Sequence, residues 1–235
     1  MMVQPVDRDS DEVPGTVGTL MRAWLDGGRP VQNTIPWPRE KWISTFPEYG
    51  DTLMAMPHCL DRRAIRTAAA TAGDADQGAG GSFIAAMAWG YGRVGYGPFR
   101  ARRALDSVAD AEARLGLVAR TVRTEGGPAA YEVMSGPARL TGLGPAFGTK
   151  FMYFCPQKPS GPPAIILDRL VASWLNSNVG TAFDPVPWKP ETYTRYIQLL
   201  VGWAAALGVE ADEIEECIFV AAASATPGQW SSNAT

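Results

Sequence analysis

The fold is decided by residues 135–176, which read SGPARLTGLGPAFGTKFMYFCPQKPSGPPAIILDRLVASWLN. Within them, residues 142–144 are Gly-Leu-Gly, and Pro145 follows at once. A glycine can adopt the positive φ that a sharp reversal needs, and a proline suits the first position of a helix. The pattern predicts two helices, over residues 136–142 and 145–155, joined by a very tight turn. The amides that open the second helix would then point outward, where a phosphate can bind them.

A single acid, Asp168, follows this hairpin after three apolar residues and a proline-rich turn over residues 156–163. Residues 164–176 are predicted to form a helix that carries Asp168 near its start. There the carboxylate could cap the helix by accepting hydrogen bonds from backbone amides. A buried carboxylate could also stabilise positive charge in a transition state or position an attacking group. Capping and catalysis are compatible, so the sequence leaves both open.

Together these features resemble the helix-hairpin-helix DNA glycosylase superfamily, in particular the 8-oxoguanine glycosylases and the bacterial proteins with that fold. Members of that family have a Gly-hydrophobic-Gly hairpin, a lysine early in the next helix in bifunctional enzymes, and a catalytic aspartate further along. Residues 148–150, Gly-Thr-Lys, and Asp168 stand in these places. The glycine- and aromatic-rich residues 87–100 also resemble the bacterial group. The resemblance covers roughly residues 80–220.

The resemblance makes Lys150 the residue that decides the subclass. A neutral lysine amine that attacks the sugar C1′ forms a Schiff base, and strand cleavage by β-elimination follows. Counted from the hairpin glycine, the family's lysine would fall at Ala146, one helical turn before Lys150 on the same face. If residues 148–150 are aligned with the family's motif instead, the family's lysine coincides with Lys150. Lys150 is therefore predicted to be the nucleophile, with a phosphate contact as the alternative.

The resemblance also implies base flipping, because a glycosylase cannot reach the glycosidic bond inside a stacked duplex. The predicted catalytic residues are Lys150 and Asp168. The predicted contacts to the DNA backbone are Gly142, Leu143, Gly144 and Ala146. The flipped base is expected to stack on aromatic side chains, for which the candidates are Trp89, Tyr91, Tyr96 and Phe99. The glycines among these aromatics have a simpler alternative interpretation, an irregular turn between two helices.

A monovalent cation held by hairpin carbonyls is a further implication of the resemblance, and no other cofactor or metal ligand is expected. The predicted partner is double-stranded DNA that contains a modified base. The sequence predicts no membrane contact, because it holds no run of eighteen apolar residues and its N-terminus is too acidic for a signal peptide. A monomer is expected. Three widely spaced cysteines, Cys59, Cys155 and Cys217, favour a reducing cytoplasm over a disulfide framework or a zinc site.

Helical patterns dominate the chain and little alternates with period two, so the fold class is predicted to be all-α, with about ten helices around a central cleft. Three parts are expected: a disordered acidic tail over residues 1–13, an N-terminal helical extension over 14–80, and a glycosylase-like core over 81–235. The individual helices are predicted over residues 17–25, 39–45, 60–72, 82–89 with Ser82 as cap, two within 98–123, and then 190–207 and 209–224.

The net charge of −3 is unusual for a DNA-binding protein until it is mapped along the chain. Residues 1–12 hold four acids and one base, and residues 207–235 hold five acids and no base. Residues 13–206 therefore carry 20 bases and 15 acids. A modestly basic body suits an enzyme that scans DNA, although many other proteins share it.

Three functional hypotheses follow. The first is a base-excision enzyme, for which oxidised guanine is the family expectation and a modified base of foreign DNA is possible. The second is a DNA-binding protein that keeps the hairpin without the chemistry. The third is an unrelated helical protein in which the Gly-Leu-Gly turn is a coincidence.

Overall fold

The computed structural model describes residues 12–72, 74, 78–158 and 160–225. In these residues the chain forms twelve α-helices, one 3-10 helix and one pair of two-residue strands, which confirms the all-α prediction. None of these helices is long and apolar enough to cross a membrane. The acidic tail predicted over residues 1–13 lies outside the described residues, apart from its last two positions.

The elements follow one another with short connections. In chain order the helices are α1 (Gly15–Asp26), α2 (Arg39–Thr45), α3 (Gly50–Ala55), α4 (Arg62–Ala68), α5 (Ala79–Tyr91), α6 (Gly97–Leu105), α7 (Ala111–Thr124), α8 (Gly127–Ser135), α9 (Pro145–Phe154), α10 (Arg169–Val179), α11 (Pro190–Leu207) and α12 (Ala211–Ala225). The 3-10 helix spans Pro47–Tyr49. The strands β1 (Ile35–Pro36) and β2 (Cys59–Leu60) pair antiparallel, with Ile35 opposite Leu60.

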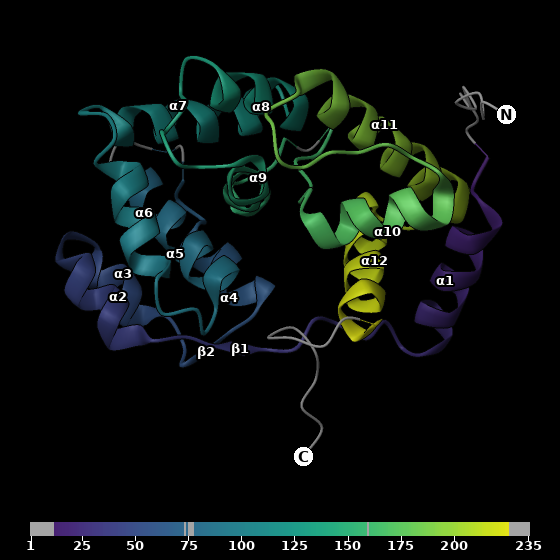
Figure 1. Cartoon of the computed structure of the whole chain (residues 1–235), viewed down its shortest axis with the longest axis horizontal. Coiled ribbons are helices and arrows are strands. Elements are labelled where there is room, and N and C mark those ends of the chain that lie inside the picture. The colour runs from purple at the N-terminus through teal and green to yellow at the C-terminus, as the bar shows by residue number, and fades with distance from the viewer. Residues whose placement is uncertain (1–11, 73, 75–77, 159, 226–235) are drawn as a thin grey trace, which may run out of the picture.

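Helix α9 lies at the centre of the molecule, where Figure 1 shows it end-on. It packs against α5, α8, α4 and α7. Helix α5 is buried along its entire length, because it consists largely of Ala, Gly and other apolar residues. The small residues allow close approach: a Cβ at Gly90 would lie 2.8 Å from the ring of Phe147 on α9. The close contact between α5 and α9 explains that glycine.

The two ends of the described chain meet on one side of the molecule. Helix α1 packs against α12 and α10, whereas α2 and α3 lie at the opposite side beside α6 (Figure 1). The connection from α1 to α2 therefore crosses the molecule. Arg62, at the start of α4, forms a buried ion pair with Glu215 of α12, at 2.7 Å. This contact joins the N-terminal helices to the last helix.

The helix predicted over residues 136–142 is wrong. Helix α8 ends at Ser135, and residues 136–144 form an irregular loop that leads to α9. Gly136 and Pro137 stop α8, because the proline has no N–H to continue its hydrogen bonds. The buried side chain of Leu140 anchors the loop that follows. The hairpin therefore consists of α8, this loop and α9, and we call residues 136–144 the hairpin loop.

Three other helix boundaries also differ from the predictions. The helix expected over 164–176 begins only at Arg169, because Asp168 is its N-cap and residues 164–167 are extended. The helix expected over 60–72 is restricted to α4, which Asp61 caps through the amide of Ala64 at 2.7 Å. Ser82 lies inside α5 and not at its start, and its hydroxyl donates to the carbonyl of Gly78. The helices predicted over 17–25, 39–45, 190–207 and 209–224, and the pair within 98–123, are confirmed.

Candidate catalytic pair and DNA-binding loop

Asp168 is placed by an extended segment, residues 164–167, that lies between α9 and α11. Two tyrosine hydroxyls of α11 hold the backbone of this segment. Tyr193 accepts a hydrogen bond from the amide of Ile165 at 3.0 Å and donates one to its carbonyl at 2.8 Å. Tyr196 donates to the carbonyl of Ile166 at 2.7 Å. These bonds satisfy buried backbone groups that have no helix or sheet partner.

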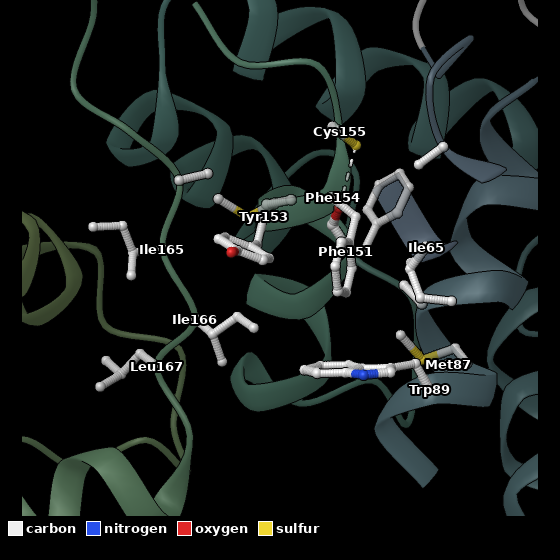
Figure 2. Close-up of a cluster of buried hydrophobic side chains, with 14 of the residues drawn as sticks. Ile65, Met87, Trp89, Phe151, Tyr153, Phe154, Cys155, Ile165, Ile166 and Leu167 are labelled. Carbon is white, nitrogen blue, oxygen red and sulfur yellow. Dashed lines mark hydrogen bonds between the residues drawn. The ribbon is translucent and has the colours of Figure 1, made fainter. Parts of the chain in front are cut away.

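The side chains of the same segment alternate between its two sides, as an extended backbone requires. Figure 2 shows Ile166 pointing toward Trp89, with Ile165 and Leu167 on the other side. The amide of Leu167 donates to the hydroxyl of Thr149 on α9 at 3.1 Å. Asp168 is therefore anchored to α9 on one side and to α11 on the other, in a position that the backbone fixes.

Lys150 and Asp168 are in direct contact. The Lys150 Nζ lies 2.8 Å from Asp168 Oδ2, and the two side chains are only 7% and 13% exposed. The other carboxylate oxygen, Oδ1, accepts the amides of Leu170 at 3.0 Å and Val171 at 3.2 Å. Capping and pairing therefore use different oxygens of one carboxylate. The helix cap anticipated from the sequence coexists with a contact to the predicted lysine.

The surroundings keep the Asp168 carboxylate ionised. Burial by itself would raise the pKa of Asp168, but the Lys150 ammonium and the hydrogen bonds from Lys150, Val171 and Leu170 bring that pKa below its usual value. A carboxylate so held is a fixed negative charge in a site largely shielded from water. Such a charge can stabilise positive charge that develops on a substrate nearby.

Phe147 completes the immediate surroundings of Lys150, and the sequence analysis missed it. The Lys150 Nζ lies 5.7 Å from the centroid of the Phe147 ring. Tyr91 stacks on the same ring with a centroid distance of 4.2 Å. A signal was present in the sequence, because Phe147 is three residues before Lys150 and so lies on the same helical face.

The hairpin loop and the first turn of α9 present unpaired backbone amides. Within the part of the chain that the structure describes, the amides of Gly142, Gly144 and Ala146 donate to no protein group. Gly142 has φ +83°, and a Cβ added at Gly142 or Gly144 would meet nothing within 4 Å. The glycines thus leave open space in front of the amides. Leu143 differs, because its amide donates to the carbonyl of Leu140 at 3.2 Å and its side chain is buried.

Trp188, which the sequence analysis also missed, holds the hairpin loop in place. Its indole Nε1 donates to the carbonyl of Leu143 at 3.2 Å. Its ring packs against Gly148, where an added Cβ would lie only 2.4 Å from the ring carbon Cη2. The ring also lies 5.0 Å from that of Tyr131 on α8. One side chain therefore contacts both helices of the hairpin and the loop between them.

The four aromatic residues predicted to stack on a flipped base are placed very differently. Trp89 is 1% exposed and packs edge-on against Phe154 at 5.1 Å, so it offers no face to a base in this conformation. Tyr91 is covered on one face by Phe147. Tyr96 and Phe99 are 55% and 66% exposed. The structure therefore brings Tyr91 next to Lys150, buries Trp89 in the core, and leaves Tyr96 and Phe99 on the surface.

Three exposed arginines lie in the hairpin loop, beside it or next to Asp168. Arg139 lies within the loop, and Arg169 follows Asp168 directly. Arg103 lines a cavity of about 480 Å³ together with Thr141 of the loop. Among the described residues, these three side chains form no ion pair or hydrogen bond, whereas Arg102 and Arg114 are paired with acids. Unpaired arginines beside free amides are suited to phosphate oxygens.

Comparison with known proteins gave one match. The model of a family described as "Putative 8-oxoguanine DNA glycosylase OGG-like protein" matches residues 28–219. The match includes α9, the hairpin loop and both Lys150 and Asp168. No curated protein and no solved structure matched the chain significantly.

Proposed function

The chain belongs to the family of 8-oxoguanine DNA glycosylase OGG-like proteins, and from this premise we propose that it is a DNA glycosylase. It would flip out a modified base of double-stranded DNA and excise it with the help of Asp168, an oxidised purine such as 8-oxoguanine being the favoured substrate. The observation that carries the proposal is the shielded contact of 2.8 Å between Asp168 Oδ2 and the Nζ of Lys150, on the helix that follows the hairpin loop.

The hairpin loop would bind the DNA backbone next to the flipped nucleotide. The free amides of Gly142, Gly144 and Ala146 are donors for phosphate oxygens, and the start of α9 adds the positive end of a helix dipole. Leu143 would contribute by anchoring the loop, since its own amide is already bonded. Arg139 and Arg169 would add charge-assisted contacts to neighbouring phosphates.

Asp168 would act on the sugar. When the glycosidic bond breaks, positive charge develops on the deoxyribose ring, and a fixed carboxylate nearby lowers the energy of that state. Lys150 is the group in contact with this carboxylate, so the two side chains would reach the same sugar. If Lys150 is the nucleophile, its ammonium first gives up a proton, and the neutral amine then attacks C1′ while the glycosidic bond breaks and the base leaves. Opening of the sugar ring gives a Schiff base, and β-elimination of the 3′ phosphate cleaves the strand. Base release would depend on Asp168 in either case, and on Lys150 as well if Lys150 is the nucleophile. Lyase activity would require both residues.

A monovalent cation at the hairpin loop belongs to the proposal. The carbonyls of Leu140 and Leu143 each accept one hydrogen bond, from Leu143 and Trp188 respectively. A carbonyl oxygen has two lone pairs, so both carbonyls can still contribute to a cation site. A bound cation would supply further positive charge next to the phosphate. We also propose that the protein acts as a monomer in a reducing cytoplasm, with its three cysteines, Cys59, Cys155 and Cys217, as free thiols.

The test of the proposal is Asp168→Asn. Asparagine keeps the shape of the side chain and its capping ability but removes the charge, so the protein should remain folded and bind DNA. Base release, measured on a panel of duplexes that each carry one modified base, should fall by about a hundredfold or more. The matched control is Asp184→Asn, an exposed aspartate that caps the amide of Val186.

Two results would overturn the assignment. Full excision by Asp168→Asn, with Asp184→Asn equally active, would show that the carboxylate has no part in the chemistry. If the wild-type protein binds the duplexes but releases no base from any of them, it is a DNA-binding protein without glycosylase activity.

A further inference from the structure

Two large aromatic side chains lie on the surface at the start of α6. Phe99 is 66% exposed and Tyr96 is 55% exposed, and they are three residues apart. Single exposed apolar residues are ordinary, but two exposed aromatic residues within one helical turn indicate a contact surface. The Arg100 guanidinium lies 4.9 Å from the centroid of the Tyr96 ring. Aromatic rings interleaved with arginines are typical of surfaces that bind nucleic-acid bases.

The backbone that carries Phe99 is firmly held. A Cβ at Gly97 would lie 2.7 Å from Tyr91 and 3.0 Å from Trp42, so the first turn of α6 fits tightly against both rings. Pro98 is buried next to it. The Lys41 Nζ donates to the carbonyl of Gly95 at 2.6 Å. The side chain of Phe99 is thus exposed, while the backbone next to it is tightly packed. A backbone that is already ordered loses less conformational entropy when the side chain binds a partner.

This surface is connected to the candidate site in two ways. Phe99 and Thr141 of the hairpin loop line the same cavity of about 480 Å³, and the Thr141 amide donates to the Ser107 hydroxyl at 3.0 Å. In addition, Tyr96 contacts Tyr91 with a centroid distance of 6.0 Å, and Tyr91 stacks on Phe147 beside Lys150. A DNA strand bound at the hairpin loop would therefore pass close to Phe99.

We propose that Phe99 inserts into the DNA base stack at the position from which a nucleotide has been flipped, and packs against the unpaired base of the opposite strand. The inference rests on the proposed function, because flipping creates the gap. An apolar side chain that fills such a gap replaces part of the lost stacking. Arg100, which lies over the Tyr96 ring, and Arg103, which lines the same cavity as Phe99, would contact the phosphates on either side of the gap.

The experiment uses a duplex that contains a tetrahydrofuran abasic analogue opposite 2-aminopurine, whose fluorescence depends on stacking. No base can be released from the analogue, so the signal is independent of the chemistry. Saturating wild-type protein should change the 2-aminopurine emission. Phe99→Ala should lose most of that change at saturation and bind about tenfold more weakly, the scale of one lost base–aromatic stack. Phe99→Trp should restore both.

Met54→Ala is the control, because Met54 is 53% exposed on α3, and it should behave like the wild type. If Phe99→Ala gives the wild-type emission at saturation, or if the wild-type protein leaves the emission unchanged, the inference is overturned. The two proposals can fail separately. A signal that depends on Phe99 in a protein that excises no base removes the glycosylase assignment alone, whereas excision with an emission insensitive to Phe99 removes the insertion alone.

Discussion

Lys150 and Asp168 each determine the environment of the other. Removing the carboxylate leaves a largely buried ammonium without its partner, and removing the ammonium leaves Asp168 with only its two backbone donors. Breaking a buried pair from one side costs more than the pair itself contributes, since an uncompensated charge remains. Asp168→Asn and Lys150→Gln also leave one charge without its partner, but they keep the size and hydrogen-bonding capacity of the side chain, so they disturb the site less than alanine would.

Lys150→Gln separates the two roles of the lysine. If Lys150 is the nucleophile, borohydride trapping of the protein on abasic DNA should disappear in this variant, because no Schiff base can form. Lys158→Gln, in the segment that follows α9, should be trapped like the wild type. If Lys150 contacts phosphate instead, the trapped species should persist, while affinity and its dependence on salt concentration decrease.

The sequence predicted both members of the pair, but not their surroundings. Lys150 and Asp168 are eighteen residues apart, and the family resemblance was enough to select them. Tyr193 and Tyr196, which hold the segment before Asp168, come from a helix more than twenty residues further on. Their tyrosine side chains look like ordinary core residues in the pattern of α11. Only tertiary packing reveals that their hydroxyls bond the backbone next to Asp168.

At the scale of elements, the hairpin shows where sequence patterns are reliable. The start of α9 was predicted correctly, because Gly144-Pro145 marks a helix start through local backbone preferences. The helix predicted over residues 136–142 is wrong, because Gly136-Pro137 ends α8 at Ser135 and no helix resumes before Pro145. That segment is anchored by burial of Leu140 and not by helical hydrogen bonds. Local signals define the boundary, and long-range packing defines the loop.

Trp188→Phe tests whether the hairpin loop needs its indole donor. Phenylalanine keeps an aromatic ring near Gly148 and Tyr131 but removes the hydrogen bond to the carbonyl of Leu143. Affinity for duplex DNA should fall by roughly threefold to tenfold, the equivalent of one net hydrogen bond, while the melting temperature changes little. Trp174→Phe on α10 is the control. Unchanged affinity in a folded Trp188→Phe protein would show that the loop holds its shape without this bond.

At the scale of the whole molecule, acidic and basic residues that lie far apart in the sequence form ion pairs in the fold. The acidic helix α12 pairs with arginines from the N-terminal part: Glu213 with Arg29, Glu215 with Arg62, and Asp212 with Arg66. Part of the basic excess of residues 13–206 is therefore neutralised and does not face DNA. The sequence shows how many basic and acidic residues this region holds, but not which of them form ion pairs. The unpaired arginines near the hairpin loop are a better guide to the DNA-binding surface than the net charge.

The buried Glu215 makes stability depend on pH. Burial raises its pKa from 4.5 to about 7, although the Arg62 guanidinium acts to lower it. Because the pKa is higher in the folded state, Glu215 favours folding below pH 4.5, and this contribution is lost as the pH rises through about 7. Urea unfolding should show a decrease of at most about 3 kcal/mol in the free energy of unfolding across this interval.

Glu215→Gln should remove that decrease, because glutamine does not titrate. The control is Glu132→Gln, an exposed position on α8, which should retain the wild-type pH dependence. An identical slope in Glu215→Gln would mean that another group is responsible. Asp168 has the opposite effect on stability. Its pKa is lower in the folded state than in the unfolded state, so it stabilises the fold at pH values above the unfolded pKa. This stabilisation is lost as the pH falls through the folded pKa.

The contact between Arg62 and Glu215 also has a consequence for synthesis on the ribosome. The two residues are 153 positions apart, so at about 5–20 residues per second the arginine is made roughly 8–30 s before its partner. In the finished protein Arg62 lies against the rings of Trp89 and Tyr153, and without Glu215 its charge would have to be buried alone. We therefore expect the part of the core around Arg62 to close only after α12 is available to pair with it. Helix α12, the last of the described helices to be translated, thus provides the partner that the buried Arg62 of α4 needs.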